Sequence, residues 1–128
     1  MKITCIDHLV LTVEDIDATV AFYSRVLGMV PISFAGERMG LSFGAQKINL
    51  HNAGGEIKPH CKNPVPGSTD ICFITETPMP LVMRHLASCE VNILAGPLQR
   101  QGAVGPLLSI YILDPDSNLI EIANRINE

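Results

Sequence analysis

Five side chains in strand-like stretches of the chain could bind a cation or contact a substrate: His8, Asn49, His51, Asp70 and Glu121. An imidazole with two carboxylates suits a borderline to hard divalent ion, because imidazole is typical of zinc, iron and nickel sites and carboxylates extend the choice to manganese and magnesium. The same residues also fit structural roles, namely a hydrogen-bonded core histidine at His8, a strand-entry cap at Asp70 and a sheet-surface residue at Glu121. Both interpretations stay open at the level of the residues.

Alternation of side chains along a strand predicts that these groups share one kind of surface. In each of the predicted strands that carry them, one face is apolar and the opposite face bears an ionisable or amide group. Leu9, Leu11 and Val13, for example, alternate with His8 and its neighbours. Sheets that curve with helices on the outside would gather the five groups into one concavity, where isolated buried charges are costly unless they are paired or bound to a cation.

The strands that carry these residues belong to two consecutive segments of the chain, or runs, which have the same order of predicted strands and helices. The first run is predicted as a strand at 3–13, a helix at 16–27 ended by Gly28, and strands at 29–34, 39–43 and 47–52. An irregular connector with three prolines and three glycines follows at 53–68. The second run is predicted as a strand at 69–75, a helix at 79–89, and strands at 92–95, 107–113 and 119–124. Each run has the order β-α-β-β-β.

An internal repeat relates the two runs. When the segment that starts at residue 8 is aligned with the segment that starts at residue 70, His8 matches Asp70 and the alignment continues without a gap through the first helix. Segment 48–52 likewise matches 120–124, which places Asn49 opposite Glu121. The sequence therefore predicts an α+β fold of two tandem β-α-β-β-β modules, 1–55 and 67–128, joined by the connector within a single domain at 1–128.

Composition narrows the classes of function. With 128 residues, of which 47% are hydrophobic and 17% charged, the chain is long enough for one packed domain and too apolar for a disordered one. Nine Lys and Arg against 13 Asp and Glu give a net charge of −4, which argues against nucleic acid or an anionic membrane surface as a partner. No stretch resembles a secretion signal or a membrane span, so we expect a cytoplasmic protein.

The four cysteines are widely separated and form no CxxC pair, so we expect reduced thiols. Cys5 and Cys72 fall in strand-like stretches and Cys89 ends a helix-like one, which predicts small buried hydrophobic residues. Cys61 follows His60 in the connector, but neighbouring side chains on an extended chain point apart, which disfavours a reactive pair.

Two segments carry a family resemblance. One is IDHLVLTVEDIDATVAFYSRVLGM at 6–29, with a strand histidine, an Asp-led helix and an FYxxxLGM ending. The other is LDPDSNLIEI at 113–122, a DPD turn followed by a strand glutamate. Over essentially its whole length the chain resembles the vicinal oxygen chelate superfamily, also called the glyoxalase, bleomycin-resistance and dioxygenase superfamily. Within it, the chain is similar to glyoxalase-domain-containing protein 5 and its bacterial, lactoylglutathione lyase-like relatives.

The resemblance implies paired modules whose mixed sheets form a cupped, barrel-like surface with the helices outside and one metal at its base. The family's metal positions fall on His8, Asp70 and Glu121, and the fourth glyoxalase position falls on Asn49. Glyoxalase I enzymes usually have a carboxylate at the Asn49 position and His or Gln at the Asp70 position, so this chain departs from the pattern at both. His51, two residues along the same face, would partly compensate.

The same resemblance implies substrate contacts at Ser109 and Tyr111, and a homodimer, since in several relatives the cup forms between modules of two subunits. The shared chemistry is chelation of a substrate through neighbouring oxygens by a metal that acts as a Lewis acid. Zn, Ni, Mn and Fe are the candidate ions, and glutathione is a candidate co-substrate. Glu121, besides being a ligand, is expected to be the base that moves the proton next to a carbonyl.

The leading hypothesis is a metal-dependent lyase or isomerase that acts on a small oxo compound or its glutathione adduct. Thiol transfer to an epoxide, as in fosfomycin resistance, is favoured by Tyr111 but disfavoured by Asp70 and by the lack of an evident Arg and Lys cluster. Ring-cleaving dioxygenase chemistry is disfavoured because it needs two histidines and one carboxylate. A metal-free drug- or metabolite-binding protein is the alternative from another class, although aromatic residues are only 5% and Trp is absent.

Overall fold

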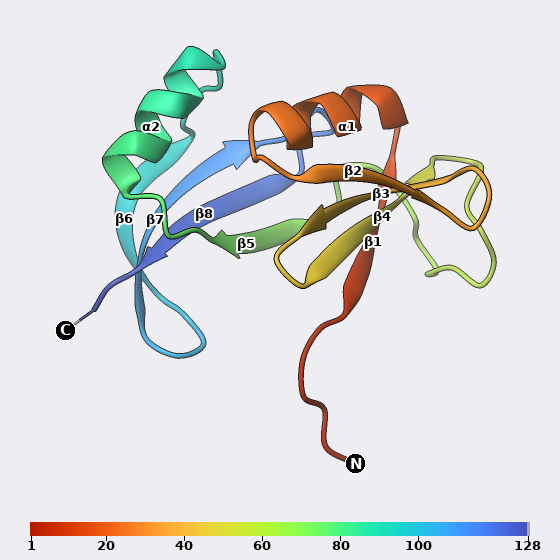
Figure 1. The fold of residues 1–128 in the computed structure, drawn as a ribbon, viewed down its shortest axis with the longest axis horizontal. Coiled ribbons are helices and arrows are strands. Elements are labelled where there is room, and N and C mark those ends of the chain that lie inside the picture. The colour runs from red at the N-terminus through yellow and green to blue at the C-terminus, as the bar shows by residue number, and fades with distance from the viewer. Residues whose placement is uncertain (128) are drawn as a thin grey trace. The chain divides into compact units, whose positions relative to one another are not determined.

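The computed structural model describes residues 1–127 and shows two compact units, residues 1–68 and the residues from 69 onward. Each unit contains one helix and one four-stranded sheet (Figure 1). The first unit consists of β1 (His8–Val13), α1 (Ile16–Arg25), β2 (Val30–Phe34), β3 (Arg38–Phe43) and β4 (Gln46–Asn52). The second consists of β5 (Asp70–Ile74), α2 (Met79–Ser88), β6 (Ala95–Gln101), β7 (Pro106–Leu113) and β8 (Leu119–Arg125).

In the first unit the strand order is β1-β4-β3-β2, with β1 parallel to β4 and the other pairs antiparallel. The N-cap of α1 is Asp15, whose carboxylate accepts a hydrogen bond from the Ala18 backbone N–H at 3.1 Å. The helix packs on the sheet face that presents the buried Leu11, Leu41 and Ile48. The opposite face is left for the polar side chains of β1 and β4.

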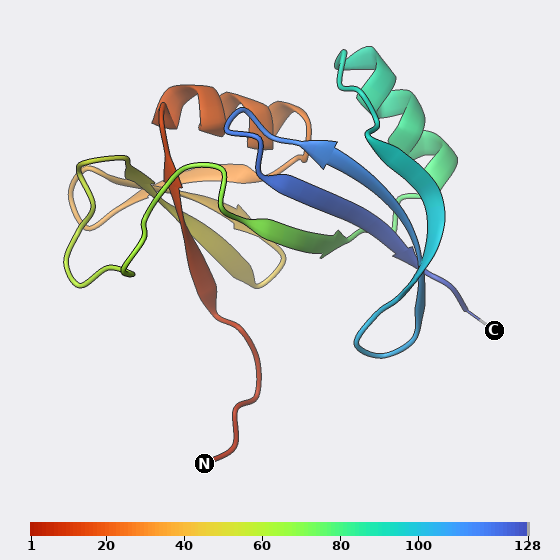
Figure 2. The same cartoon turned by 180° about the vertical axis from the view of Figure 1, so that it is seen from behind.

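In the second unit the strand order is β5-β8-β7-β6, again with one parallel pair, β5 and β8. α2 has no side-chain N-cap, but proline in its first turn suits a helix start because the N–H groups there have no partner within the helix. The helix runs alongside β6 (Figures 1 and 2). Its buried side chains are Met79, Val82 and Leu86, and those of the two central strands include Ile110, Ile112, Ile120 and Ile122.

The two sheets have the same topology, which confirms the predicted α+β fold with two β-α-β-β-β repeats. Both sheets are open, so neither closes into a barrel. The register also confirms the pairing of positions between the repeats. Asn49 lies opposite Val10, the third residue of β1, and Glu121 lies opposite Cys72, the third residue of β5. Thus Asn49 and Glu121 occupy equivalent positions in the two sheets.

The structure corrects the predicted bounds of two strands. β1 begins at His8 rather than at residue 3, because its partner β4 begins at Gln46 and no neighbouring strand is left to pair with earlier residues. β6 spans 95–101 rather than 92–95. Pro97 has no N–H to donate and so argues against a strand, but β6 is an edge strand, where proline is tolerated, and its register shifts between Ala95 and Leu98.

Both helices end one or two residues before their predicted ends, and each is ten residues long. Gly28 has a φ of 71°, the left-handed conformation that commonly follows a helix and that glycine adopts without a steric penalty. Within residues 1–127, neither helix is long and apolar enough to cross a membrane.

Candidate functional site

The polar face of the first sheet carries three of the predicted site residues. His8 is the first residue of β1. Asn49 and His51 are two residues apart on the neighbouring strand β4, so they point to the same face. His8 is exposed, whereas Asn49 and His51 are only 4% and 7% exposed. The prediction that these three groups share one face is therefore confirmed for this unit.

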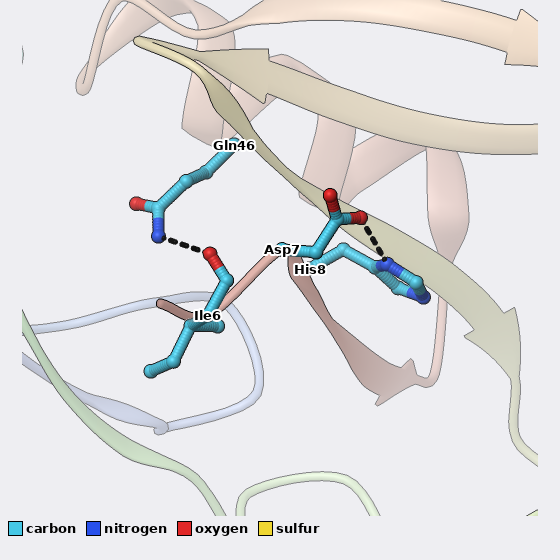
Figure 3. Close-up of polar contacts among 4 residues, drawn as sticks. All are labelled: Ile6, Asp7, His8 and Gln46. Atoms are coloured by element: carbon cyan, nitrogen blue, oxygen red, sulfur yellow. Dashed lines mark hydrogen bonds and ion pairs between the residues drawn. The ribbon is translucent and has the colours of Figure 1, made fainter. Parts of the chain in front are cut away.

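A carboxylate orients the His8 imidazole. Asp7 Oδ2 lies 2.8 Å from His8 Nδ1, as Figure 3 shows. Because the carboxylate accepts, Nδ1 carries the donated proton and the lone pair of a neutral ring lies on Nε2. The preceding backbone is held as well, since Gln46 Nε2 donates to the Ile6 carbonyl oxygen at 2.8 Å. His8 can thus offer Nε2 to a cation.

Asn49 and His51 each bury a polar atom that has no hydrogen-bond partner within residues 1–127. These atoms are Asn49 Oδ1 and His51 Nε2. Burial lowers the pKa of His51, and the Arg38 guanidinium lowers it further, while Glu56 acts in the opposite direction. His51 is therefore neutral near pH 7. An unpaired buried polar atom costs free energy, so both positions favour a bound molecule that supplies the missing partner.

The corresponding face of the second sheet carries the other predicted residues. Asp70 and Cys72 are two residues apart on β5 and point to the same face. Glu121 on β8 is the cross-strand partner of Cys72, and Tyr111 on β7 is the partner of Glu121. Ser109, two residues before Tyr111, is fully buried, and its Oγ has no partner among the described residues. The predicted grouping of these residues on one face is confirmed for this unit too.

The thiol of Cys72 stays protonated beside Glu121. Partial burial of its sulfur raises the Cys72 pKa to about 11, although the residue keeps exposed surface, and the charge of the Glu121 carboxylate and a hydrogen bond to it add to the shift. The thiol donates to this carboxylate and is a poor nucleophile at neutral pH. All four cysteines are free, as predicted, but Cys5 and Cys72 are exposed rather than buried; of the predicted buried cysteines only Cys89 is so.

Tyr111 is held by a residue that the sequence did not single out. Arg100 Nε donates to Tyr111 Oη at 2.9 Å, and the guanidinium carbon lies 5.6 Å from the centre of the phenol ring. Because Oη accepts this hydrogen bond, its own proton is available to a bound molecule. Arg100 lies in the edge strand β6, beyond the strand predicted there, which is why sequence reasoning missed it.

A buried hydrogen-bond network positions the start of both β5 and β8. Asp114 Oδ1 accepts from the backbone N–H groups of Asp116 and Asn118, each at 2.9 Å, and Asp114 Oδ2 accepts from Asn118 Nδ2 at 2.9 Å. Asn118 Oδ1 in turn accepts from the Thr69 backbone N–H at 2.9 Å. The DPD turn therefore holds the residue before Asp70 and the strand that carries Glu121.

A second unpredicted group lies on the first sheet. Lys47 Nζ is 3.8 Å from the centre of the Phe34 ring, and the guanidinium carbon of Arg38 is 5.0 Å from it. The three residues come from β4, β2 and β3, and their spacing along the chain shows no periodicity that could have revealed the cluster. The structure thus places one arginine and one lysine against the same aromatic ring, which the sequence did not indicate.

The family of the chain follows from comparison with known proteins. A family model described as Glyoxalase/Bleomycin resistance protein/Dioxygenase superfamily matches residues 5–122. The chain belongs to this superfamily. One relative is Virulence protein STM3117 of Salmonella typhimurium strain LT2, 50% identical over 126 residues, or 98% of this chain and 88% of the relative. Glyoxalase domain-containing protein RDO1 of Mycosarcoma maydis is 45% identical over 97% of this chain and 70% of its own length.

Solved structures share the fold of this chain. The crystal structure of STM3117 from Salmonella typhimurium has a TM-score of 0.97 and covers 98% of this chain and 100% of that chain. A lactoylglutathione lyase from Agrobacterium tumefaciens has a TM-score of 0.73 at 22% identity, with 97% and 96% covered. FosX, a fosfomycin resistance protein from Listeria monocytogenes complexed with Mn(II), has a TM-score of 0.67 at 20% identity, with 98% and 93% covered. The last two likenesses show the shared fold.

The donor types on the two sheet faces are those that divalent metal ions bind. The first unit offers His8 Nε2, and the second offers the Asp70 and Glu121 carboxylates; one imidazole and two carboxylates suit a borderline to hard divalent ion. Within residues 1–127, no three His, Cys, Asp or Glu side chains are grouped so that they could hold such an ion, and His8, Asp70 and Glu121 do not form such a group.

Proposed function

We propose that this protein is a divalent-metal-dependent lyase or isomerase of the glyoxalase type, acting on a small oxo compound or its glutathione adduct. The observation that carries the proposal is the matching register of the two sheets. His8 and Asp70 occupy the first positions of β1 and β5, and Glu121 occupies the position on β8 that corresponds to Asn49 on β4. These positions hold the donor types that a divalent ion prefers.

In this proposal His8 binds through Nε2, and Asp70 and Glu121 bind through carboxylate oxygens. A bound Zn, Ni, Mn or Fe ion would supply Lewis-acid chemistry at neighbouring oxygens of the substrate. Asp7 supports the first ligand, because a carboxylate on Nδ1 fixes the ring and raises the basicity of Nε2. Since the donors come from both units, the proposal includes a homodimer whose site lies between modules or between subunits.

Apolar side chains on the same two faces support such an interface. Val10 is 45% exposed, Ile74 42% and Leu113 41%. Alternation places Val10 on the face of His8, Ile74 on that of Asp70, and Leu113 on that of Tyr111. Covering these side chains would remove apolar surface from water at roughly 25 cal/mol per Å², which favours association.

Glu121 is the proposed base. It would accept the proton from the carbon next to the substrate carbonyl and return it to the neighbouring carbon, so that the isomerisation conserves all atoms. Asn49, at the equivalent position, has an amide and cannot take this role. The Cys72 thiol is protonated at neutral pH and so does not compete for the proton. Tyr111 lies directly opposite Glu121 and can donate its phenol proton to a substrate oxygen.

Buried polar atoms without partners support the proposed substrate contacts. Asn49 Oδ1, His51 Nε2 and Ser109 Oγ are buried and have no hydrogen-bond partner among residues 1–127. A polar substrate, with glutathione as a candidate co-substrate, would satisfy them and thereby gain affinity. We therefore assign Asn49, His51, Ser109 and Tyr111 to substrate binding in the proposed site.

Metal content tests the proposal. Untagged wild type, His8→Ala and Glu121→Ala are dialysed against a mixture of Zn, Ni, Mn and Fe ions, then against metal-free buffer, and examined by elemental analysis. His85→Ala and Glu76→Ala, at exposed positions outside the proposed site, are the matched controls. We expect about one metal per chain in the wild type and the controls, and loss of metal in both site variants. Wild type without metal would overturn the proposal and favour a metal-free binding protein.

Activity tests the role of Glu121. Metal-loaded wild type should convert the hemithioacetal of methylglyoxal and glutathione, and Glu121→Gln that still holds its metal should lose about 10²–10⁴-fold in rate, the contribution typical of a positioned base. Full activity of this variant would remove Glu121 from the role of base while leaving it a candidate ligand.

A further inference from the structure

We propose that Arg100 is a positioning residue, which fixes Tyr111 as a hydrogen-bond donor to the part of the substrate that is remote from the metal. This inference rests on the proposed function and adds a requirement on the substrate, namely an acceptor oxygen away from the reacting carbons. It is carried by the Arg100–Tyr111 hydrogen bond, by the register of β6, β7 and β8, and by the burial of Ser109.

The hydrogen bond spans a long stretch of the second sheet. Arg100 is the cross-strand partner of Leu107, and Tyr111 lies four residues beyond Leu107 on β7, roughly 13 Å along the strand. Even so, Arg100 Nε and Tyr111 Oη are 2.9 Å apart. Both side chains must therefore extend along the sheet toward each other rather than project away from it.

The burial of Ser109 agrees with this arrangement. Ser109 is the cross-strand partner of Leu98, and this pair lies between Arg100 and Tyr111 on the same face. Ser109 is 0% exposed, whereas Tyr111 is half-buried and Arg100 is exposed. The two longer side chains thus lie over Ser109, and Tyr111 Oη is the group that a bound molecule meets first.

The pair points away from the second unit's other proposed metal ligand, Asp70. On β8, the partner of Asp70 lies two residues before Glu121, whereas the partner of Ser109 lies two residues after it. Tyr111 is itself the partner of Glu121, but its ring leans over Ser109 toward Arg100. Its phenol proton is therefore offered to a part of the substrate remote from Asp70.

Arg100 also fixes the direction of this contact. A guanidinium has only N–H donors and stays charged, so Tyr111 Oη has to accept in their hydrogen bond. Arg100 Nη1 donates to the Gln99 carbonyl oxygen at 3.4 Å, which holds the guanidinium against its own strand. With a cation beside it and one lone pair used, the hydroxyl favours donation to a substrate oxygen. The substrate class that this suits is a thiol adduct with an amide carbonyl or a carboxylate, rather than an oxo compound alone.

Turnover of two hemithioacetals tests the role of the pair. Metal-loaded protein receives the methylglyoxal adducts of glutathione, which has amide carbonyls and carboxylates, and of ethanethiol, which has no such acceptor. Wild type should prefer the glutathione adduct in kcat/KM. Tyr111→Phe and Arg100→Met should each lose about tenfold of that preference, through KM rather than kcat, as expected for one lost hydrogen bond.

Two further variants separate positioning from direct contact. Arg100→Lys, which retains an N–H donor, should keep most of the preference. Arg100→Met in the Tyr111→Phe background should cause no additional loss, because Arg100 acts through Tyr111. Arg84→Met, which removes a charge at an exposed position of α2, is the matched control and should keep the full preference.

Three outcomes would overturn the inference. One is an unchanged preference in Arg100→Met. Another is an equal loss for both adducts in kcat, which would place Tyr111 at the reacting carbons. The third is an additional loss in the double variant, since Arg100 would then contact the substrate itself. If Tyr111→Phe does not fold, equal losses of preference in Arg100→Met and Arg100→Lys would overturn it.

A second readout does not depend on activity. The chain has five arginines, and the Nε–H signal of Arg100 in nuclear magnetic resonance spectra of metal-free protein is identified by its loss in Arg100→Lys. Exchange of this N–H with water should be about fivefold faster in Tyr111→Phe, the factor of a typical hydrogen bond. Unchanged exchange would overturn the inference.

Failure of metal-loaded wild type to convert either adduct would overturn the proposed function and not this inference. Binding of S-ethylglutathione, a stable thioether, by metal-free protein then decides the inference. Wild type should bind it about tenfold tighter than Tyr111→Phe and Arg100→Met do. Equal affinities in the three proteins would overturn the inference.

Discussion

Replacing Asn118 by alanine should destabilise the second unit strongly. Asn118 is 2% exposed, donates from Nδ2 to Asp114 Oδ2 at 2.9 Å, and accepts at Oδ1 from the Thr69 N–H at 2.9 Å. Loss of a hydrogen bond to a charged group costs about 1.5–3 kcal/mol and loss of a neutral one about 1 kcal/mol. We therefore expect Asn118→Ala to lower the free energy of unfolding by about 3 kcal/mol, a large part of the 5–15 kcal/mol typical of a domain.

Urea unfolding followed by circular dichroism measures this change. The midpoint should fall while the slope with urea stays the same, and the thermal midpoint should drop by about 12 °C, at roughly 4 °C per kcal/mol for a chain of this length. Asn92→Ala, at an exposed position, is the matched control and should change the free energy of unfolding by less than about 0.5 kcal/mol. A loss below about 1 kcal/mol in Asn118→Ala would show that water replaces both bonds, and would refute the positioning role of the DPD turn.

Three further predictions concern single residues. Gly96→Ala should lower the free energy of unfolding, measured in urea, by about 2–3 kcal/mol, because at a φ of 101° the new Cβ would lie 2.5 Å from the Ser109 carbonyl oxygen. An unchanged free energy of unfolding would show that β6 can shift. Because the pKa of His51 is lowered in the folded state, the unfolded state binds a proton more readily as the pH falls below 6.5, and the free energy of unfolding decreases there. The urea midpoint should therefore be lower at about pH 5.5 than at about pH 7.5, and His51→Gln should reduce this difference. Asp7→Asn should weaken Mn(II) or Zn(II) binding by about 10–100-fold in calorimetric titration, while the exposed Asp17→Asn should not; equal affinities in both would remove Asp7 from the support of the metal site.

Much of the fold could be predicted from short-range patterns. Alternation identified the apolar and polar faces of the strands, Gly28 marked the end of the first helix, and the repeat matched Asn49 to Glu121 before any register was known. These signals are local, because a side chain's face depends only on its neighbours along the strand, and a helix end depends on groups within one turn. The faces of the candidate site were predictable for the same reason.

The sequence was misleading where tertiary context overrides a local preference. The predicted strand at 92–95 did not extend over Pro97, which the structure places in an edge strand, and the strand-like residues around Cys5 are exposed and lie before the first residue of β1. Cys72 lies on a strand as predicted, yet it keeps exposed surface while its thiol donates to Glu121. Propensity describes what a segment can form, whereas pairing and burial depend on which segment lies beside it.

The sequence by itself determined the element order, the repeat and the residue types on each sheet face. Tertiary structure alone decided which side chains meet across strands. Arg38 and Lys47 contact the Phe34 ring. Arg100 donates a hydrogen bond to Tyr111, and Asn118 accepts one from the Thr69 N–H. Asn118 and Thr69 are 49 positions apart in the chain and are joined through parallel strand pairing. The physical reason is that cross-strand neighbours are set by register, which follows from the packing of whole strands and helices and leaves no trace in the spacing of the residues that it brings together.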